Sequence, residues 1–290
     1  MTSPRLREMT PMPATATDNR ITQTTWRLID TGHMAGPANM AIDEALLACF
    51  DPATTTPVLR LYGWQPPALS LGRFQQADQV LDLARCRTAG VPIVRRITGG
   101  GVIYHAAELT YSLVCAPHHL PTASIKESFR HLTAFLLAFY RRLGLNAGYA
   151  VDRLPADSRL GERTAFCFAG KETYDILVNG RKIGGNAQRR LRHAIFQHGS
   201  IPLHDMLGQA VQYLREIPAD LDEGTTCLTT QGIHCQETIL RTMLADVFRE
   251  AMGVTLTPAG LTPAEESTAT QLLAKYQDDR WNLAGEIGPA

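Results

Sequence analysis

Residues 95–105 are Arg95-Arg96-Ile97-Thr98-Gly99-Gly100-Gly101-Val102-Ile103-Tyr104-His105, and the fold is decided around this stretch. Three successive glycines allow positive φ and a close approach of the backbone to a ligand. The apolar runs at 91–94 and 102–104 are typical of β-strands. A strand therefore leads into a glycine-rich turn flanked by cations, which suits a carboxylate, a phosphate or a thioester carbonyl. The alternative is a tight hairpin whose glycines serve only geometry.

A second glycine-rich stretch lies at 174–188. Asn179-Gly180 is a strong hairpin signal, and residues typical of strands lie on both sides. The returning strand carries Lys182 and continues into Gly184-Gly185. A lysine beside two glycines suits a ligand-binding wall, and the alternative is a solvated hairpin lysine.

Bulk composition excludes several classes of protein. The chain has 290 residues, of which 44% are hydrophobic and 19% are charged, so it can bury a sizeable core. The formal net charge is +0, which gives no global field for nucleic acid or an anionic membrane. No apolar run is long enough to span a bilayer. We therefore expect no nucleic-acid or membrane partner.

The six cysteines are scattered without a CxxC pair. This spacing argues against a zinc ribbon and against a dense disulfide framework, so we expect a reduced, cytoplasmic protein without a metal site. Residues 1–24 are rich in Thr, Pro and Ala and lack the apolar segment of a signal peptide. We expect them to form a disordered lead-in.

Periodicity and turn signals predict an α+β fold with mixed, largely antiparallel sheets flanked by helices. Predicted strands are 26–30, 58–62, 68–71, 91–94, 102–104, 109–114, 149–151, a strand and hairpin in 165–185, and 194–202. Predicted helices are 39–50 with a cap at its start, 77–89, 124–143, 236–252 and 262–276. We expect a catalytic domain at 25–204 and a small helical C-terminal extension of it at 205–290.

Several motifs occur together in one order. They are Asn39-Met40-Ala41-Ile42-Asp43-Glu44-Ala45-Leu46, Arg60-Leu61-Tyr62-Gly63-Trp64, Ser70-Leu71-Gly72-Arg73-Phe74-Gln75, the Arg-Arg-x-Thr-Gly-Gly-Gly run, Gly180-Arg181-Lys182-Ile183-Gly184-Gly185-Asn186-Ala187-Gln188, Gln197-His198-Gly199-Ser200, and Lys275-Tyr276 with Trp281-Asn282. Over roughly 25–282 the chain resembles the superfamily of lipoate–protein ligases and octanoyltransferases, which shares its catalytic fold with biotin–protein ligases.

This resemblance implies roles for individual residues. Lys182 would contact the activated acyl carbonyl and is a candidate catalytic residue. The residues expected to line the acyl site are Arg96, Gly99, Gly100, Gly101, His105, Gly185, His198 and Gly199. Where the family usually places an aspartate after the histidine, this chain has Ala106-Ala107-Glu108.

Two chemistries share the fold. The ligases use ATP to form lipoyl-AMP, whereas the octanoyltransferases take octanoyl from acyl carrier protein through a cysteine thioester. Cys167, in Ala165-Phe166-Cys167-Phe168, precedes the Lys182 hairpin and resembles the nucleophile of the transferases commonest in Gram-positive bacteria. Its alternative is a buried core cysteine. A neighbouring Lys182 ammonium would lower the pKa of the thiol.

The resemblance therefore predicts an octanoyltransferase without a cofactor, whose acceptor is the lysine of lipoyl domains in 2-oxoacid dehydrogenases or in the glycine-cleavage H protein. The alternative is an ATP- and Mg-dependent lipoate–protein ligase, which the triple glycine fits equally well. Many ligases use an accessory C-terminal domain to form lipoyl-AMP. Because the sequence ends soon after Trp281-Asn282, we expect no such domain, which favours the transferase, although a ligase can obtain that domain as a separate polypeptide. A non-catalytic acyl-binding or lipoyl-domain-binding protein is a third hypothesis, and a biotin ligase is a distant one.

Overall fold

The computed structural model describes residues 24–122, 124–155, 172–217 and 221–286. Within them, six strands form a central mixed sheet in the order β10-β11-β6-β2-β1-β12. From β10 to β2 neighbouring strands are antiparallel, whereas β1 is parallel to both β2 and β12. The strands are β1 (Thr25–Met34), β2 (Val58–Trp64), β6 (Glu108–Cys115), β10 (Gly185–Arg190), β11 (Ile195–Pro202) and β12 (Thr255–Pro258). The predicted mixed, largely antiparallel α+β class is confirmed.

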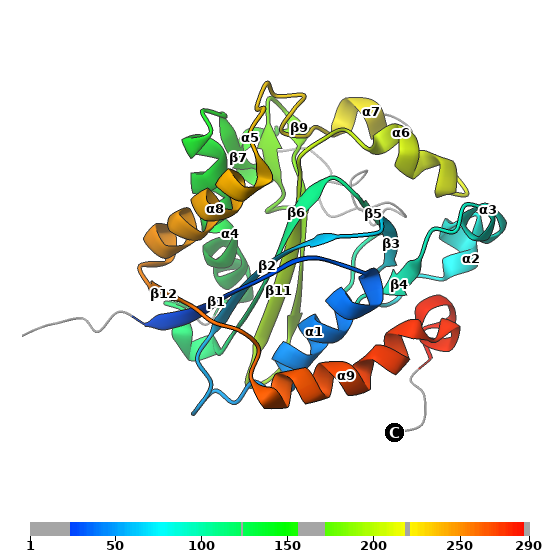
Figure 1. Ribbon diagram of the computed structural model, residues 1–290. Coiled ribbons are helices and arrows are strands. Elements are labelled where there is room, and N and C mark those ends of the chain that lie inside the picture. The colour runs from blue at the N-terminus through cyan, green and yellow to red at the C-terminus, as the bar shows by residue number, and fades with distance from the viewer. Residues whose placement is uncertain (1–23, 123, 156–171, 218–220, 287–290) are drawn as a thin grey trace, which may run out of the picture.

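Helices cover both faces of this sheet (Figure 1). α4 (Ile125–Arg142) and α8 (Glu237–Met252) pack on one face, and α1 (Gly36–Ala48) and α9 (Pro263–Gln277) pack on the other. Side chains alternate along β2: Leu59 and Leu61 join the core under α4 and α8, whereas Val58 and Tyr62 join the core under α1 and α9. The sheet therefore separates two apolar cores.

Two small sheets flank the central one. The first has the order β4-β3-β5, with β3 (Ala68–Leu71) between β4 (Ile93–Arg95) and β5 (Ile103–His105). Because β4 and β5 both pair with β3 and not with each other, the glycine stretch crosses the end of β3. The alternative of a tight hairpin is therefore wrong.

The second small sheet, β7-β8-β9, carries Lys182. It consists of β7 (Ala147–Tyr149), β8 (Ile176–Val178) and β9 (Arg181–Lys182). Asn179 and Gly180 join β8 to β9 with φ of 51° and 78°, the left-handed pair that a two-residue type I′ turn requires. The predicted hairpin is confirmed.

Local signals placed some helix ends correctly. Ser124 accepts a hydrogen bond from the Glu127 amide at the start of α4, and Thr262 with Glu265 forms the capping box of α9. The remaining short elements of the described chain are α2 (Ala77–Val80), α3 (Leu83–Thr88), α5 (Ala150–Arg153), α6 (Leu207–Ala210), α7 (Leu221–Gly224), and the single turns η1 (Pro117–His119), η2 (Val211–Tyr213) and η3 (Arg280–Ala284).

Two helix predictions were wrong. The helix expected at 77–89 is divided into α2 and α3, because Leu81 is extended and the Asp82 carboxylate caps a new helix by accepting from the Arg85 amide. α1 begins at Gly36, ahead of the expected Asn39, and has no side-chain cap. Pro37 in its first turn presets helical φ, which favours this earlier start.

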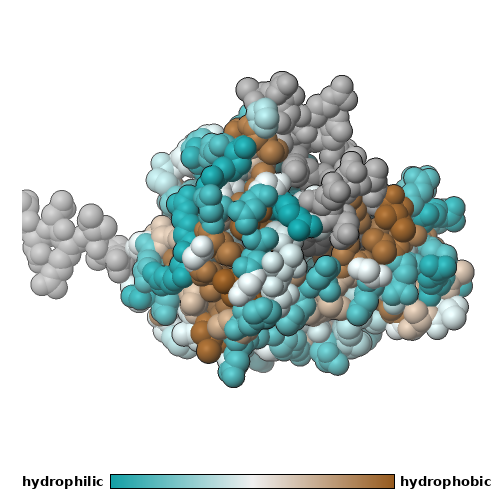
Figure 2. Space-filling view, turned by 90° about the horizontal axis from the view of Figure 1, so that it is seen from above, coloured by the Kyte–Doolittle hydropathy of each residue, from teal (hydrophilic) through white to brown (hydrophobic). Residues whose placement is uncertain are grey.

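The surface combines polar areas with a few large apolar side chains. Seen from above, hydrophobic areas interrupt a largely hydrophilic surface (Figure 2). Among the described residues, the large exposed apolar side chains are Phe74, Ile125, Val151, Ile217 and Ile239. Every helix in these described ranges is too short or too polar to cross a lipid bilayer.

Candidate active site

The glycine loop, defined here as residues 96–102, lies against the end of β3. Gly100 has a φ of +98°, which strongly favours glycine. Gly72, which follows β3, lies so close that a Cβ on it would be 1.9 Å from the Gly100 carbonyl oxygen. The close backbone approach that the structure shows here is to this second glycine. The predicted approach to a ligand stays a prediction.

Arg96 supports the loop from the inside. The side chain is buried, and its Nη1 donates to the Ser70 carbonyl oxygen at 2.7 Å and to Ser70 Oγ at 2.6 Å. Its Nη2 donates to the carbonyl oxygens of Gly101 at 2.9 Å and Gly99 at 3.2 Å. The guanidinium therefore ties the loop backbone to β3.

Arg95, the other arginine of the motif, binds residues 281–283 near the C-terminus. Its guanidinium donates to the carbonyl oxygens of Trp281 at 2.9 Å and Leu283 at 2.8 Å, and its backbone amide donates to Asn282 Oδ1 at 3.0 Å. This explains why the chain brings Trp281 and Asn282 back to β4.

A narrow inner cavity lies between the glycine loop and β11. It brings together six predicted site residues with two aromatic rings of β2. Its lining includes Tyr62, Trp64, Arg96, Gly100, His105, Gly185, His198 and Gly199. Gly199 has no room for a side chain, because a Cβ would be 2.1 Å from Asn186 Oδ1 and 2.7 Å from the Tyr111 ring. These predicted residues therefore lie around one cavity, and their roles in an acyl site stay a prediction.

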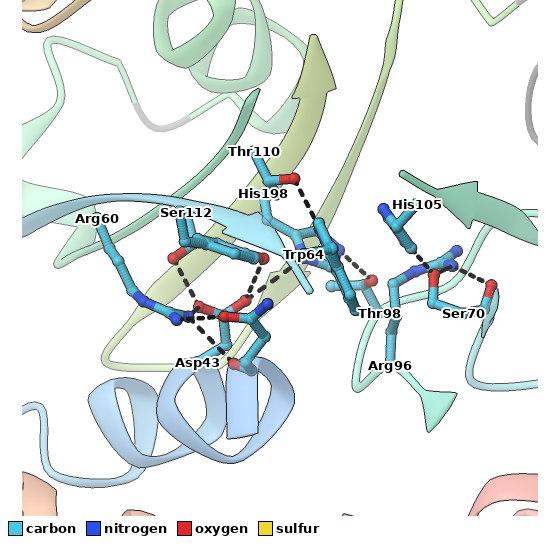
Figure 3. A network of polar contacts seen from close by, with 12 residues as sticks. Asp43, Arg60, Trp64, Ser70, Arg96, Thr98, His105, Thr110, Ser112 and His198 are labelled. Carbon is cyan, nitrogen blue, oxygen red and sulfur yellow. Dashed lines mark hydrogen bonds and ion pairs between the residues drawn. The ribbon is translucent and has the colours of Figure 1, made fainter. Parts of the chain in front are cut away.

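A buried polar network surrounds this cavity (Figure 3). At its centre the Asp43 carboxylate accepts from Arg60 Nη1 at 2.7 Å, Ser112 Oγ at 2.7 Å and Tyr62 Oη at 2.9 Å. His198 Nδ1 lies 3.7 Å from Asp43 Oδ2, and its Nε2 is 2.8 Å from Thr98 Oγ1 in the glycine loop. α1, β2, β6 and β11 are thus joined to the loop through one carboxylate.

His105 occupies the other wall of the cavity. Its ring stacks on Trp64 with centroids 3.8 Å apart and planes 11° apart. Its Nε2 lies 2.6 Å from Ser70 Oγ, and its Nδ1 lies 2.7 Å from Glu108 Oε1. Both ring nitrogens of His105 are therefore engaged.

An outer groove of about 710 Å³ adjoins the inner cavity. The two share Gly100, Asn186 and Ala187, so they are adjacent along one wall. Gly99, Gly101 and Lys182 line the groove, with the exposed Phe74 and Ile125 among its other walls. This is where the structure places the remaining predicted site residues that it describes.

Lys182 is a wall residue of this groove and not a solvated lysine. It is 2% exposed, and its Nζ lies 2.7 Å from Asp175 Oδ2, also buried. The alternative of a solvated hairpin lysine is wrong, because the Lys182 side chain lies on the buried face of β9. Cys167 lies outside the described residues.

Sequence reasoning did not assign roles to Asp43, Ser70, Glu108 or Trp64. Asp43, Trp64 and Ser70 lie inside the motifs that indicated the family, so their place in those motifs was the signal that could have identified them as site residues. Glu108 is the charged residue at the start of β6, whose other residues are apolar or uncharged, and an acidic residue in a buried strand signals a buried partner. That partner is His105.

Acid should destabilise the fold in two steps. Burial lowers the pKa of His198, so at moderately acid pH the unfolded chain takes up a proton that the folded chain does not. The free energy of unfolding therefore falls as pH drops below the ordinary histidine pKa of about 6.5. For Asp43, burial raises the pKa, but the Arg60 charge and bonds from His198 and Ser112 outweigh it and leave the pKa lowered. The contribution of Asp43 to stability is complete above about pH 4 and is lost as pH falls through the lowered value.

The measurement is the free energy of unfolding by urea from pH 7 to pH 3. In His198→Gln, the decline between about pH 6.5 and 5 should be shallower than in the unmodified chain, while the steep decline below about pH 4 remains. Identical curves for the two proteins above pH 5 would contradict the assignment to His198.

Comparison with known proteins agrees with the geometry. Residues 36–256 match the family described as Lipoyl protein ligase A/B catalytic domain. The chain is 40% identical to "Octanoyltransferase LipM" of Symbiobacterium thermophilum, covering 90% of this chain and 99% of the relative. It is 32% identical to "Octanoyltransferase LipM" of Staphylococcus aureus, covering 89% and 98%.

Solved structures have the same fold. One, lipoate-protein ligase A bound with ATP, aligns with a TM-score of 0.76 at 25% identity, over 91% of this chain and all of that one. A bi-partite lipoate protein ligase from Thermoplasma acidophilum aligns with a TM-score of 0.74 at 23% identity, over 93% and 99% of the two chains. Because the family model matches residues 36–256 and these relatives match over nearly their whole length, the chain belongs to the lipoyl protein ligase A/B catalytic domain family.

Proposed function

We propose that this protein is an octanoyltransferase of protein lipoylation, which moves octanoyl from acyl carrier protein through a thioester on Cys167 to a lysine of a lipoyl domain. The observation that carries the proposal is similarity over nearly the whole length of relatives named as octanoyltransferases. The buried Lys182 in the groove beside the glycine loop supports it, since acyl transfer needs a fixed cation or amide near the carbonyl oxygen.

In the first step, the Cys167 thiolate attacks the thioester carbonyl of the donor. A carbon–sulfur bond to Cys167 forms, the bond to the carrier thiolate breaks, and that thiolate takes up a proton. Lys182 and amides of the glycine loop stabilise the negative carbonyl oxygen of the tetrahedral intermediate. The ammonium of Lys182 also favours the thiolate form of the nucleophile.

In the second step, the neutral amine of the acceptor lysine attacks the Cys167 thioester. A carbon–nitrogen bond forms, the carbon–sulfur bond breaks, and the amine proton leaves to restore the thiol. Neither step consumes ATP. The acceptor is the lysine of lipoyl domains in 2-oxoacid dehydrogenases or in the glycine-cleavage H protein.

Intact-protein mass spectrometry tests the proposal. The protein is mixed with octanoyl acyl carrier protein in the absence of ATP. We expect an octanoyl adduct that hydroxylamine removes, followed by transfer when a lipoyl domain is added. Absence of both adduct and transfer under these conditions would refute the transferase.

The second candidate is an ATP-dependent lipoate–protein ligase. It is favoured by the structural similarity to lipoate-protein ligase A bound with ATP at 25% identity. In the same experiment the ligase would form no adduct, and lipoyl transfer would require free lipoate and ATP. A protein that binds the lipoyl domain but transfers under neither condition would be a non-catalytic member.

Replacing Lys182 by methionine should slow formation of the acyl-enzyme about 100-fold, the typical cost of losing one donor to the oxyanion. The change keeps an unbranched apolar stem and removes the charge. Rapid-quench mass spectrometry gives the rate. Lys275→Met is the matched control, because Lys275 pairs with Glu44 at 2.6 Å away from the groove. An equal slowing in both variants would argue against a role for Lys182.

A further inference from the structure

A chain of buried polar side chains connects Glu108 to the glycine loop. Its members are Glu108, His105, Ser70 and Arg96, which are 5%, 3%, 0% and 2% exposed. Buried polar groups are costly unless they are hydrogen-bonded, so a connected series of four needs a reason. The series begins on β6, passes through β5 and β3, and ends at the loop backbone.

The direction of each hydrogen bond follows from Glu108 at one end of the series and Arg96 at the other. Burial raises the pKa of Glu108, but the interaction with His105 and the hydrogen bonds from Ser200 and Thr110 outweigh it. The pKa is therefore lowered, and the carboxylate only accepts. His105 Nδ1 must then donate, and in the neutral imidazole the Nε2 accepts from the Ser70 hydroxyl. Arginine only donates, so Ser70 Oγ accepts from Arg96.

The order Ser–His–Glu has the hydrogen-bond pattern of a hydrolytic triad. Ser70, however, is fully buried, and its oxygen accepts from Arg96 at 2.6 Å. A serine in this position links two groups and is not a nucleophile.

Arg96, the last member of this hydrogen-bonded series, fixes the backbone of the glycine loop. Arg96 Nη2 holds the carbonyl oxygens of Gly99 and Gly101. In a trans peptide the N–H points opposite to the C=O, so the Gly100 amide is turned away from Arg96. Gly100 lines both the inner cavity and the outer groove.

We propose that Ser70 and Glu108 are positioning residues for acyl transfer: through His105 and Arg96 they hold the Gly100 amide where it stabilises the oxyanion. This inference rests on the proposed function. A preorganised donor acts in the transition state and contributes little to binding of the ground state.

The test is the rate of acyl-enzyme formation in a single turnover, measured as a function of donor concentration. Ser70→Ala should lower the limiting rate about 10- to 100-fold and leave the half-saturating donor concentration within about twofold. Glu108→Gln, which keeps the shape but removes the charge, should lower it in the same way. Having two variants protects the test if one of them folds poorly.

Ser128→Ala is the matched control. Ser128 is also fully buried, its Oγ accepts from Arg190 at 2.6 Å, and it donates to the Ile125 carbonyl oxygen at 2.9 Å. The two variants thus lose the same chemistry. Arg190 lines the outer groove, but of the two serines only Ser70 bonds to an arginine that holds the glycine loop. We expect Ser128→Ala to acylate at the unmodified rate.

Nitrogen-15 NMR of histidine-labelled protein supplies a readout of the tautomer. His105, assigned through His105→Gln, should carry its proton on Nδ1 in the unmodified chain, and Glu108→Gln should produce the Nε2–H form. If Ser70→Ala and Glu108→Gln acylate at the unmodified rate, or Ser128→Ala slows as much, the positioning role is wrong. If the unmodified chain forms no adduct, the proposed function itself fails.

Discussion

Replacing Cys167 by alanine is expected to abolish both the octanoyl adduct and transfer to the lipoyl domain, while the circular-dichroism spectrum and the melting temperature stay unchanged. The reason is that a thioester intermediate requires a sulfur nucleophile, and no alanine can replace it. The measurement is intact mass after incubation with octanoyl acyl carrier protein without ATP. Full transfer by the variant would contradict the covalent mechanism.

The other thiols make this test selective. Burial raises the pKa of Cys115 to about 12 and also raises the pKa of Cys86, so both are poor nucleophiles at neutral pH. Cys235 is exposed, lies away from the groove and the inner cavity, and is the matched control. Cys235→Ala should form the adduct as the unmodified chain does.

Replacing Arg60 by methionine should destabilise the fold by about 3–5 kcal/mol, the usual cost of leaving a buried charge without its partner. Arg60 is 0% exposed, and its guanidinium donates to Asp43 Oδ1 and Asn39 Oδ1, each at 2.7 Å. The variant leaves the Asp43 carboxylate buried with only neutral donors and His198 at 3.7 Å. Urea unfolding at pH 7 measures the loss.

A double variant separates the charge from the packing. Arg60→Met combined with Asp43→Asn should be more stable than Arg60→Met alone, because the uncompensated charge is gone. If the double variant is the less stable of the two, the charge explanation fails. Arg280→Met, which breaks the exposed pair with Asp278, should leave the urea midpoint unchanged.

Elements defined by short-range signals could be predicted from the sequence. The Asn179-Gly180 turn, the amphipathic helix after Ser124 and the capping box at Thr262 depend on residues within one or two turns of each other. Their hydrogen bonds form between near neighbours in the chain, so the residue pattern contains the information.

Elements defined by distant partners could not be predicted. The residues of β12 (Thr255–Pro258) have only a weak local strand signal. The strand forms because it pairs in parallel with β1, whose residues lie more than 200 positions earlier in the sequence. The glycine stretch looked compatible with a hairpin, because nothing local shows that β3 lies between its two flanking strands. Strand pairing of this kind is decided by the whole sheet.

The candidate site shows the same division. The sequence alone determined the family, the glycine loop and the residue types of an acyl site, because these are ordered motifs along the chain. Only the tertiary structure decided that Lys182 is buried against Asp175, that Arg96 holds the loop, and that Ser70 and Glu108 are connected to it through His105. Two of these contacts, from Ser70 to Arg96 and from Ser70 to His105, join residues distant in sequence. The burial that directs all of these hydrogen bonds exists only once the sheets have packed.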